Sequence, residues 1–380
     1  MSRSSLDTAI SPIAGQAAAQ GSSRSRTALV ASEQWLGSNG YAAFRALRRG
    51  GWTAHLVPER EFIPLRWKSR AMRAAGRLLR SAGVTEFNAE LLRQAEQQRP
   101  DFFLAFKGAF VTAESLRRMK ALGIRTYCFF PDVSFHVHGK YLPEALPVYD
   151  WIFIAKSFGV RDLASSLGVR NASLLLHGFD PEVHRPLSLT DQERQAYGCD
   201  VSFIGTWSPK KEAILASLVN RRPSIALRVW GEQWRRENLH PALSRSTGGR
   251  EVTGDEYAKA IIASRINLGL LSEQRPGASS GDQITSRTFH IPACGSFMLH
   301  ERTSELLEQF DEGVTVACFE GADELAERVD EYLSDESRRT DIARRGHDLV
   351  WSRDSWDHRV AAIVEHHMRV APPTRQIGVS

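Results

Sequence analysis

The chain has 380 residues, of which 42% are hydrophobic, 24% charged and 9% aromatic, and this composition excludes collagen-like and wholly disordered proteins. Its 49 basic and 44 acidic residues leave a net charge of +5, which over so long a chain is too small to indicate a nucleic-acid-binding protein. Because a typical domain has roughly 100–200 residues, the length predicts two domains.

The first 26 residues are rich in Ser, Ala, Gly and Gln, which predicts a disordered leader over 1–26. This segment lacks the continuous apolar core of a signal peptide. No run of the chain approaches the roughly 18 apolar residues of a membrane-spanning helix. The four cysteines stand far apart with no C-x-x-C spacing, so they predict neither a disulfide framework nor a zinc site. We therefore expect a cytoplasmic protein.

The next segment, 27–185, alternates short apolar strands with helices. The helices are expected at 41–49, 113–122 and 160–167, where apolar residues recur at helical spacing. The strands are expected at 27–32, 53–57, 102–106, 124–130, 151–155 and 172–176. A strand, a helix and a second strand in sequence form a βαβ unit with parallel strands. We predict a Rossmann-like domain over 27–185.

The stretch 66–80 carries six basic residues and no acidic one, so by count it exceeds the net charge of the whole chain. Trp67, Ala71, Ala74 and Leu78 fall on one helical stripe. An ordinary amphipathic helix with its Trp packed inward is one interpretation. Peripheral contact with the inner face of the membrane is another. An acidic protein or polysaccharide acceptor is the third.

After a polar stretch at 186–199, where we place the domain boundary, a second alternating series begins. Strands are expected at 201–204, 225–230, 265–271, 296–299 and 314–318, and helices at 209–220, 255–264, 286–294 and 303–310. Three helical patterns follow, through Met368. The series predicts a second Rossmann-like domain over 200–350, then a helix over 351–370 and a tail over 371–380. Paired domains of this kind bind ligands in the cleft between them.

Specific motifs mark both halves. The second half contains C-D-V-S-F-I-G-T-W (199–207), P-K-K-E-A-I-L (209–215) and S-R-T-F-H-I-P-A-C-G-S-F-M-L (286–299). The first half contains P-D-F-F-L-A-F-K-G (100–108), Y-D-W-I-F-I-A (149–155) and L-L-H-G-F-D-P (175–181). In this order the chain beyond residue 26 resembles the CgeB-like glycosyltransferases, a family named after a spore maturation protein and related to the GT-B enzymes.

This resemblance implies an α/β protein with the GT-B fold, two facing Rossmann-like domains with a C-terminal helix crossing back to the first. It implies a nucleotide-sugar donor held mainly by the second domain and an acceptor held by the first. Catalysis in such enzymes needs neither a metal ion nor another cofactor. The nucleotide sugar is then a co-substrate.

The loop after strand 201–204 is the expected diphosphate site. It opens a helix, so its backbone amides and lysines would face an anion at the strand's end. We expect donor contacts from Gly205, Thr206, Lys210 and Lys211, with Lys211 meeting the diphosphate as the basic residue of related GT-B enzymes does. Alternatively, the two lysines are ordinary solvated residues of a first helical turn.

The helix at 286–294 carries the second group of donor candidates. CgeB-like proteins usually have R-x-F-E here, but this chain has Arg287 followed by His290, and Asp282 stands where related enzymes have their first glutamate. Arg287 offers a fork of donors to anionic oxygens. His290 can hydrogen-bond a ribose hydroxyl but lacks the two oxygens of a carboxylate. Gly295 completes the expected donor-binding set through the A-C-G turn. Alternatively, Arg287 and His290 line a buried helix start.

The first domain supplies the cleft loop and the candidate bases. The loop after the first strand can approach a ligand closely because of its glycines, and it comprises Gly37, Ser38, Asn39 and Gly40. A general base that takes the acceptor's proton is expected at Asp132, His136 or His138, with Asp132 ranked first. An Asp after Pro is often only a turn or a helix cap. His177 is expected to shape the interdomain hinge.

The sequence therefore predicts a metal-independent glycosyltransferase, hexosyl or deoxyhexosyl, that uses a UDP, GDP or dTDP sugar. The acceptor would be a surface glycan, a lipid-linked glycan or a protein. The alternative is a catalytically silent GT-B protein that binds nucleotide or glycan as a scaffold, because the acid is missing at position 290. Nucleic-acid binding through 66–80 is a third hypothesis, without any recognised motif.

Overall fold

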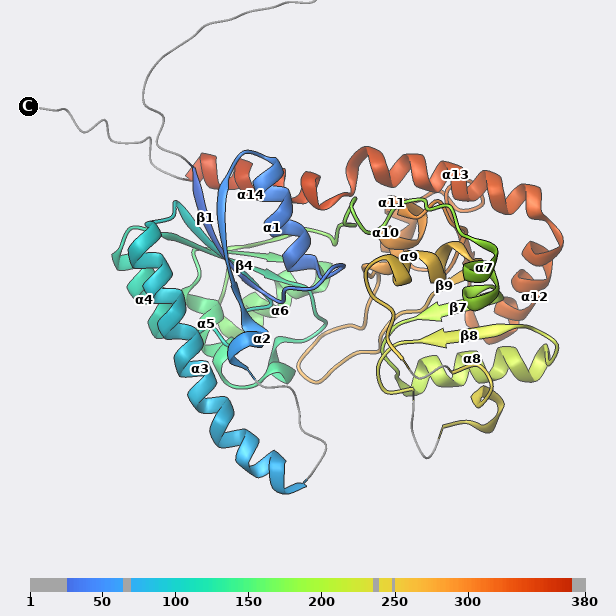
Figure 1. Cartoon of the computed structure of the whole chain (residues 1–380), viewed down its shortest axis with the longest axis horizontal. Helices are drawn as coiled ribbons and strands as arrows, with labels where there is room; N and C mark the ends of the chain where they lie inside the picture. The colour runs from blue at the N-terminus through green and yellow to red at the C-terminus, as the bar shows by residue number, and fades with distance from the viewer. Residues whose placement is uncertain (1–25, 64–69, 235–238, 248–249, 371–380) are drawn as a thin grey trace, which may run out of the picture.

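The computed structural model describes residues 26–63, 70–234, 239–247 and 250–370, without the side chains of 70–79. Two α/β domains lie side by side in Figure 1, the first in blue to green and the second in yellow to red. All of the predicted leader except Arg26, and the predicted tail 371–380, lie outside the described residues. Both domains have parallel sheets, so the predicted pair of Rossmann-like domains is confirmed.

The first domain is built on a six-stranded parallel sheet in the order β2-β1-β3-β4-β5-β6. Its strands are β1 (Thr27–Ser32), β2 (Thr53–Pro58), β3 (Phe102–Phe106), β4 (Arg125–Phe130), β5 (Trp151–Ile154) and β6 (Ala172–Leu174). Every residue of β3 is buried, because helices cover both faces of a central parallel strand. This strand is therefore a continuous apolar run, which is why the sequence located it so closely.

Helices α1 (Asn39–Arg49), α2 (Glu59–Phe62), α3 (Arg70–Gln98), α4 (Ala113–Ala121), α5 (Tyr141–Ala145) and α6 (Ser157–Leu167) belong to the first domain, with 3₁₀ turns η1 (Phe135–His138) and η2 (Leu146–Val148). Ser38 caps α1 by accepting a hydrogen bond from the Tyr41 amide. Gly40 lies so close to Ser32 that a Cβ would overlap its side chain. The start of α1 is thereby held against the end of β1.

The second domain has a five-stranded parallel sheet in the order β11-β10-β9-β7-β8. Its strands are β7 (Cys199–Ile204), β8 (Leu227–Trp230), β9 (Ser264–Gly269), β10 (Met298–Glu301) and β11 (Ala317–Phe319). Its helices are α7 (Asp191–Tyr197), α8 (Pro209–Arg221), η3 (Pro241–Leu243), α9 (Asp255–Ile262), α10 (Arg287–Ala293), α11 (Ser304–Gln309), α12 (Gly321–Ser334) and α13 (Glu336–Arg353). Helix α7 lies inside the stretch 186–199, which the sequence interpretation left without a helix.

The last helix, α14 (Trp356–Val370), crosses from the second domain back to the first and packs against α1. Trp356 is buried, and its Nε1 donates to Asn39 Oδ1 at 3.1 Å. Farther along α14, His367 Nδ1 lies 3.0 Å from the hydroxyl of Tyr127 on β4. The crossover helix that the resemblance implied is therefore present, and buried contacts fix it to the first domain.

The basic stretch 66–80 cannot be assigned a surface role from the structure, since 64–69 and the side chains of 70–79 lie outside the described residues. The backbone of 70–80 is the beginning of α3, which extends down and away from the first domain in Figure 1. Of its six basic side chains only Arg80 is described. In the described part of the chain no helix is both long enough and apolar enough to span a bilayer.

Candidate functional site

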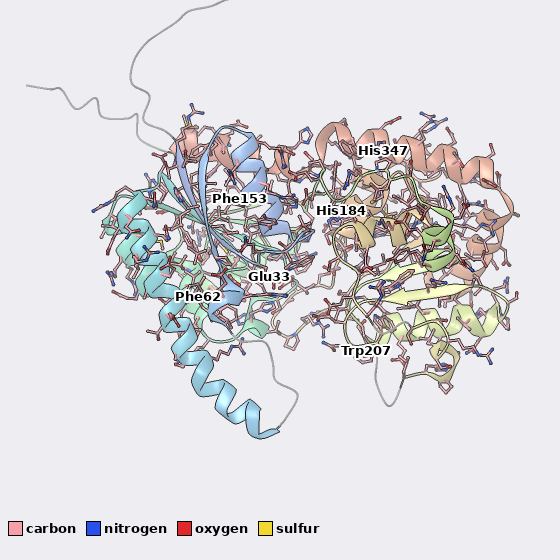
Figure 2. All side chains as sticks on the ribbon, viewed as in Figure 1. Glu33, Phe62, Phe153, His184, Trp207 and His347 are labelled. Carbon is pink, nitrogen blue, oxygen red and sulfur yellow. The ribbon has the colours of Figure 1, made fainter. Side chains whose placement is uncertain are left out.

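Charged residues follow the carboxyl ends of the strands of both sheets, where parallel α/β domains bind their ligands. In the first domain Glu33, Glu59 and Lys107 follow β1, β2 and β3. The side chain of Glu33 lies on the side of that domain that faces the second (Figure 2). Its charge also raises the pKa of Glu251 in the second domain, after burial and Glu232. The two rows of strand ends thus face one interdomain cleft.

The buried Lys211 and the half-buried Arg287 form a pair of cations on the second-domain side of this cleft. The Arg287 guanidinium lies over the Phe203 ring, 5.1 Å from its centre, and the Lys211 ammonium is 5.9 Å from the same centre. Lys211 Nζ donates to Thr206 O and Ser272 Oγ at 3.2 and 3.1 Å. An ammonium has three N–H donors, so one donor stays free for a ligand.

Lys211 is buried and Arg287 is half-buried, and the carboxylates of Asp282, Glu273 and Glu301 act on their charges only from beyond ion-pair distance. Burial first, and then the charge of Arg287, lower the pKa of Lys211 to about 8. Burial likewise lowers the pKa of Arg287. Among the described residues neither side chain forms an ion pair, and Arg287 Nε has no hydrogen-bond partner. Positive charge that is largely removed from water and held in no ion pair is costly unless an anion completes it, so the pair is a candidate anion site.

The amides of the first turn of α8 are already satisfied. Ser208 Oγ accepts from Lys211 N, and Glu273 Oε1 accepts from Lys210 N at 2.9 Å. The Lys210 ammonium forms an ion pair with Glu301. The expectation that these amides and both lysines meet the diphosphate therefore needs correction: Lys211 is available, whereas the amides and Lys210 are engaged.

Asp282 is paired across the domain interface. Its Oδ1 lies 2.6 Å from Nζ of Lys156, and both side chains are buried. Lys156 comes from the first domain, directly before α6, and its Nζ also donates to Ile284 O at 3.0 Å. Burial opposes ionisation of Asp282, but Lys156 and Ser272 keep its pKa below the usual value. The structure thus places Asp282 in the cleft as the partner of a lysine.

The segment 270–286, between β9 and α10, reaches over to the first domain at several points. Pro276 O accepts from Ser134 Oγ at 2.6 Å, and Ser279 N donates to Asp162 Oδ2 at 2.9 Å. Gly277, with φ +79°, lies so close to His136 that a Cβ would overlap its ring. His136 therefore packs against this segment, in contrast to the catalytic role expected for it.

His290 lies in a stack of buried aromatic groups. Its ring is parallel to that of His184 at 3.8 Å, and its Nδ1 lies 3.2 Å from the Tyr257 hydroxyl. Burial lowers the pKa of His290 to about 3, although the backbone of Gly178 favours its protonated form. The ring is thus neutral near pH 7. This arrangement agrees with the alternative of a buried helix start for His290.

The glycine candidates separate into two places. Gly205 lies in the cleft: a Cβ there would come within 2.8 Å of Arg287 Nη1, so the glycine lets the guanidinium lie over the strand end. The exposed Thr206 contributes its carbonyl to Lys211. Gly295, with φ +73°, ends α10 at its far terminus and packs near Pro186. Because α10 starts at the cleft with Arg287, Gly295 lies away from the donor candidates, and its role is the turn into β10.

Asp132 and His138 lie together in the first domain. Asp132 Oδ2 is 2.7 Å from Lys107 Nζ and 2.9 Å from His138 Nε2. Burial opposes its charge, but His138 and Lys107 hold the pKa of Asp132 well below its usual range. A carboxylate so strongly stabilised accepts a proton poorly. The geometry instead favours His138, with Asp132 holding one ring nitrogen and the other left to accept.

The loop from Gly37 to Gly40 lies beside the hinge. Asn39 Nδ2 is 3.5 Å from Nδ1 of His177, which burial and then Lys156 keep neutral by lowering its pKa well below the usual value. The His177 carbonyl accepts from Arg359 of α14 at 3.1 Å. The residue before the loop, Leu36, accepts from the Gly254 amide of the second domain at 3.2 Å. His177 and this loop therefore serve the domain junction.

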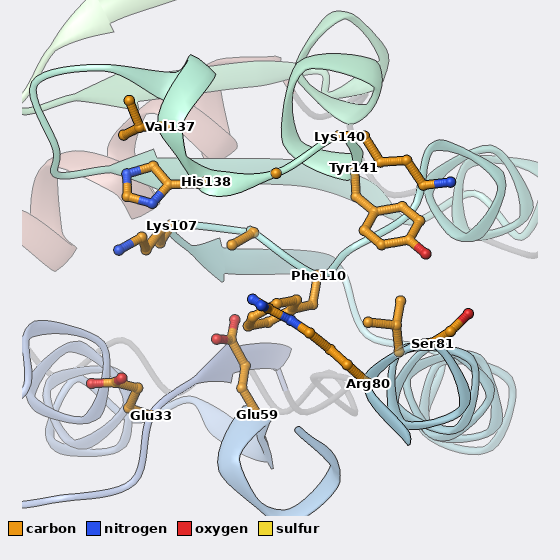
Figure 3. A pocket seen from close by; sticks show the side chains of 13 residues that line it. Glu33, Glu59, Arg80, Ser81, Lys107, Phe110, Val137, His138, Lys140 and Tyr141 are labelled. Atoms are coloured by element: carbon orange, nitrogen blue, oxygen red, sulfur yellow. The ribbon is translucent and has the colours of Figure 1, made fainter. Parts of the chain in front are cut away.

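A cavity of about 650 Å³ opens in the first domain beyond β1, β2 and β3 (Figure 3). Its walls include Glu33, Glu59, Arg80, Lys107 and His138. Figure 3 shows the Glu59 carboxyl pointing from α2 towards the middle of the cavity, with Lys107 and His138 on the opposite wall. Burial and the charge of Glu33 raise the pKa of Glu59 to about 8, against the opposing effect of Lys107.

Sequence reasoning missed Glu59, Lys107 and Lys156. Each is a charged residue that closely follows a strand of the first sheet, and this position was the one signal that could have found them. Lys107 also has φ +65° without being glycine; such strained backbone concentrates at functional sites. In the described part of the chain no group of three or more His, Cys, Asp or Glu residues could hold a metal ion.

Comparison with known proteins identifies the fold and a family likeness. Residues 209–365 match the glycosyl transferase-like family. No curated protein matches the sequence. The matched segment begins with α8 and includes Lys211 and Arg287, and the likeness to the CgeB-like proteins stays a prediction.

Solved structures resemble the chain over nearly its whole length. A glycosyltransferase from Rickettsia africae ESF-5 is 11% identical with a TM-score of 0.63, covering 91% of this chain and 98% of its own. Sucrose-phosphate synthase from Thermosynechococcus elongatus is 11% identical, with a TM-score of 0.61 and coverages of 90% and 98%. HepE from Anabaena, in complex with UDP-glucose, is 13% identical, with a TM-score of 0.60 and coverages of 90% and 100%. The chain therefore has the GT-B fold.

Proposed function

We propose that this protein is a glycosyltransferase that moves a sugar from a nucleotide-sugar donor to a hydroxyl acceptor. The observation that carries the proposal is a pair of cations, the buried Lys211 and the half-buried Arg287, which lie over one Phe203 ring and form no ion pair among the described residues. When the sugar of a nucleotide sugar is transferred, the leaving group is a nucleoside diphosphate with at least two negative charges. Preorganised cations in a dry site stabilise such a leaving group strongly.

The family likeness of 209–365 supports this proposal, because the matched segment contains both cations. HepE, a protein of the same fold, has been solved with UDP-glucose, which makes UDP sugars the first donors to test. In the reaction the acceptor oxygen bonds to the anomeric carbon while the bond from that carbon to the diphosphate oxygen breaks. The diphosphate keeps the bonding electron pair, and Lys211 and Arg287 take the electrostatic role that a metal ion has in other transferases.

The acceptor's proton passes to a base in the first domain. We assign this role to His138, whose Nε2 lies 2.9 Å from Asp132. The carboxylate fixes the ring and stabilises the imidazolium that forms, as in other His–Asp pairs. The proposal requires no metal and no further cofactor. The transferred sugar and its stereochemistry are left open by these residues.

A thermal-shift screen of UDP, GDP and dTDP tests the donor side directly. We expect one of them to raise the Tm, and Lys211→Ala and Arg287→Ala to weaken its binding at least tenfold while both variants stay folded. Lys120→Ala is the matched control, since Lys120 pairs with Asp150 at the opposite edge of the first sheet. The proposal would be refuted by a protein that binds none of the three nucleotides, or by wild-type binding in both variants.

Turnover assays then separate an enzyme from a scaffold. Transfer, or slow hydrolysis, of the matching nucleotide sugar supports the proposed reaction. Tight nucleotide binding without turnover over a panel of sugars would favour the catalytically silent alternative, which the missing acid at position 290 leaves open.

A further inference from the structure

The cavity of the first domain contains a buried carboxyl group with no protein partner. Glu59 is 7% exposed, and its buried Oε1 has no hydrogen-bond partner among the described residues. An unpartnered polar group is costly to bury, yet the group points into a cavity of about 650 Å³. A ligand in this cavity would supply the missing partner.

Cations surround this carboxyl. Arg80 reaches in from α3 and lies over the Phe110 ring at 5.1 Å, and Lys140 lies over Tyr141 at 5.2 Å. The rings hold both side chains at the wall of the cavity. Neither Arg80 nor Lys140 forms an ion pair within the described ranges. Both charges are therefore free to meet an anion.

The two carboxyl groups of the cavity wall, Glu33 and Glu59, contribute little negative charge to the cavity. Glu33 pairs with Arg60 at 3.2 Å and accepts from Trp35 Nε1 at 2.7 Å. Glu59 is uncharged near pH 7 because its pKa is raised to about 8. Lys107 is the third cation of the wall, with Asp132 beside it. The cavity as a whole is consequently positive and contains a carboxyl that can donate a hydrogen bond.

We propose that this cavity binds the acceptor of the transfer reaction, and that the acceptor is a sugar carrying an anionic group, a phosphate or a carboxylate. Arg80 and Lys140 meet the anionic group, and the Glu59 carboxyl donates a hydrogen bond to it or to a neighbouring hydroxyl. His138 on the opposite wall reaches the hydroxyl that attacks the donor. This inference rests on the proposed function, since it names the class of its acceptor.

The test is calorimetric binding to the full-length protein with three probes: glucose 6-phosphate, glucuronic acid and glucose. UDP at saturation, or the Lys211→Ala variant, keeps the probes from the diphosphate site. We expect at least one anionic probe to bind tenfold more tightly than glucose, and the preferred probe tells phosphate from carboxylate. Arg80→Ala should weaken that binding at least fivefold, whereas Arg117→Ala, on the exposed face of α4, should leave it unchanged. Equal binding of all three probes, no binding, or an Arg80 variant equal to the control overturns the inference.

A pH series isolates Glu59. Glucuronic acid keeps its charge between pH 7 and 9, so a fall in its affinity over this range reports ionisation on the protein. Glu59→Gln should bind it and remove most of the fall; an unchanged fall in this variant contradicts the role of Glu59. The other titratable or charged groups that act on Glu59 or line the cavity wall are Glu33, Arg80, Lys107, Cys128, His138, Lys140, Tyr141 and Tyr149.

The two proposals fail separately. A protein that binds UDP through Lys211 but does not distinguish the anionic probes keeps the proposed function and loses this inference. A protein that binds the anionic probes through Arg80 but no nucleoside diphosphate keeps the cavity as an anion site and loses the transferase proposal.

Discussion

Replacing Glu59 with Gln should stabilise the protein in a pH-dependent way. Burial and Glu33 raise the pKa of this carboxyl from the ordinary 4.5 to about 8. The folded state therefore keeps a proton that the unfolded chain releases. A carboxyl group whose pKa is higher in the folded state favours folding most at low pH, where it is protonated in both states. The free energy of unfolding then falls as the pH rises from the pKa of the unfolded state to the pKa of the folded state.

The size of the effect follows from the shift. Between pH 5 and 8 the wild-type free energy of unfolding should fall by about 1.4 kcal/mol for each pH unit because of this one group. At pH 7 the accumulated cost is about 3 kcal/mol, and it levels off near 5 kcal/mol above pH 8. Gln keeps the shape of the side chain and cannot ionise, so the free energy of unfolding of Glu59→Gln should not show this fall with pH.

Urea unfolding of both proteins at pH 5, 6, 7, 8 and 9 measures the difference. We expect the free energy of unfolding of Glu59→Gln to exceed that of the wild type by a margin that grows with pH to 8 and is constant afterwards. Glu86→Gln, on the exposed side of α3, corrects for the loss of one carboxyl. A margin that stays the same from pH 5 to 8 would mean that Glu59 ionises normally, and it would refute the burial argument.

Substitutions at five other positions probe the cleft. Because the pKa of Lys211 is lowered to about 8, UDP affinity measured by calorimetry should fall about tenfold from pH 7 to 9 as the ammonium loses its proton, and Lys211→Arg should remove this fall. His138→Gln should lower kcat by about 10²-fold or more without changing the Kd for UDP, and Asp132→Asn should lower kcat less; an altered UDP Kd would place both residues on the donor side. Lys156→Met should cost about 3–5 kcal/mol in thermal unfolding because it strands Asp282, whereas the double variant with Asp282→Leu should recover most of the loss.

Much of the fold could be predicted because its strands are buried on both faces. The 102–106 strand was located to the residue, since a short apolar run bounded by polar residues has few other interpretations. Helix α7 (Asp191–Tyr197) was missed because none of its residues is buried. A helix without an apolar face has no hydrophobic period to detect, although Thr190 and Glu193 form a capping box that signals its start.

The candidate site residues that stand in sequence motifs were named from the sequence, whereas those whose chemistry depends on tertiary packing were missed. Lys211 and Arg287 stood in motifs at strand and helix ends, and the structure brings them over one ring. Lys156 and Glu59 gain their chemical character from tertiary burial, which single charged residues do not reveal in a sequence. The ranking of Asp132 above His138 followed from the family resemblance, and only the positions of Lys107 and His138 show how firmly the carboxylate is held.

The histidine at position 290 has a consequence for the anion site. An acid here, as in the CgeB-like proteins that the sequence resembles, would be buried three residues after Arg287 in the same helix. Arg287 already acts on His290, lowering its pKa after burial, so the two positions are electrostatically coupled. A buried carboxylate would therefore offset the charge of Arg287, whereas a neutral imidazole stacked on His184 leaves it intact. Under the proposed function, the chain would lack a carboxylate contact to the ribose and keep a stronger cation for the diphosphate, so the departure at position 290 is compatible with donor binding that depends mainly on the phosphates.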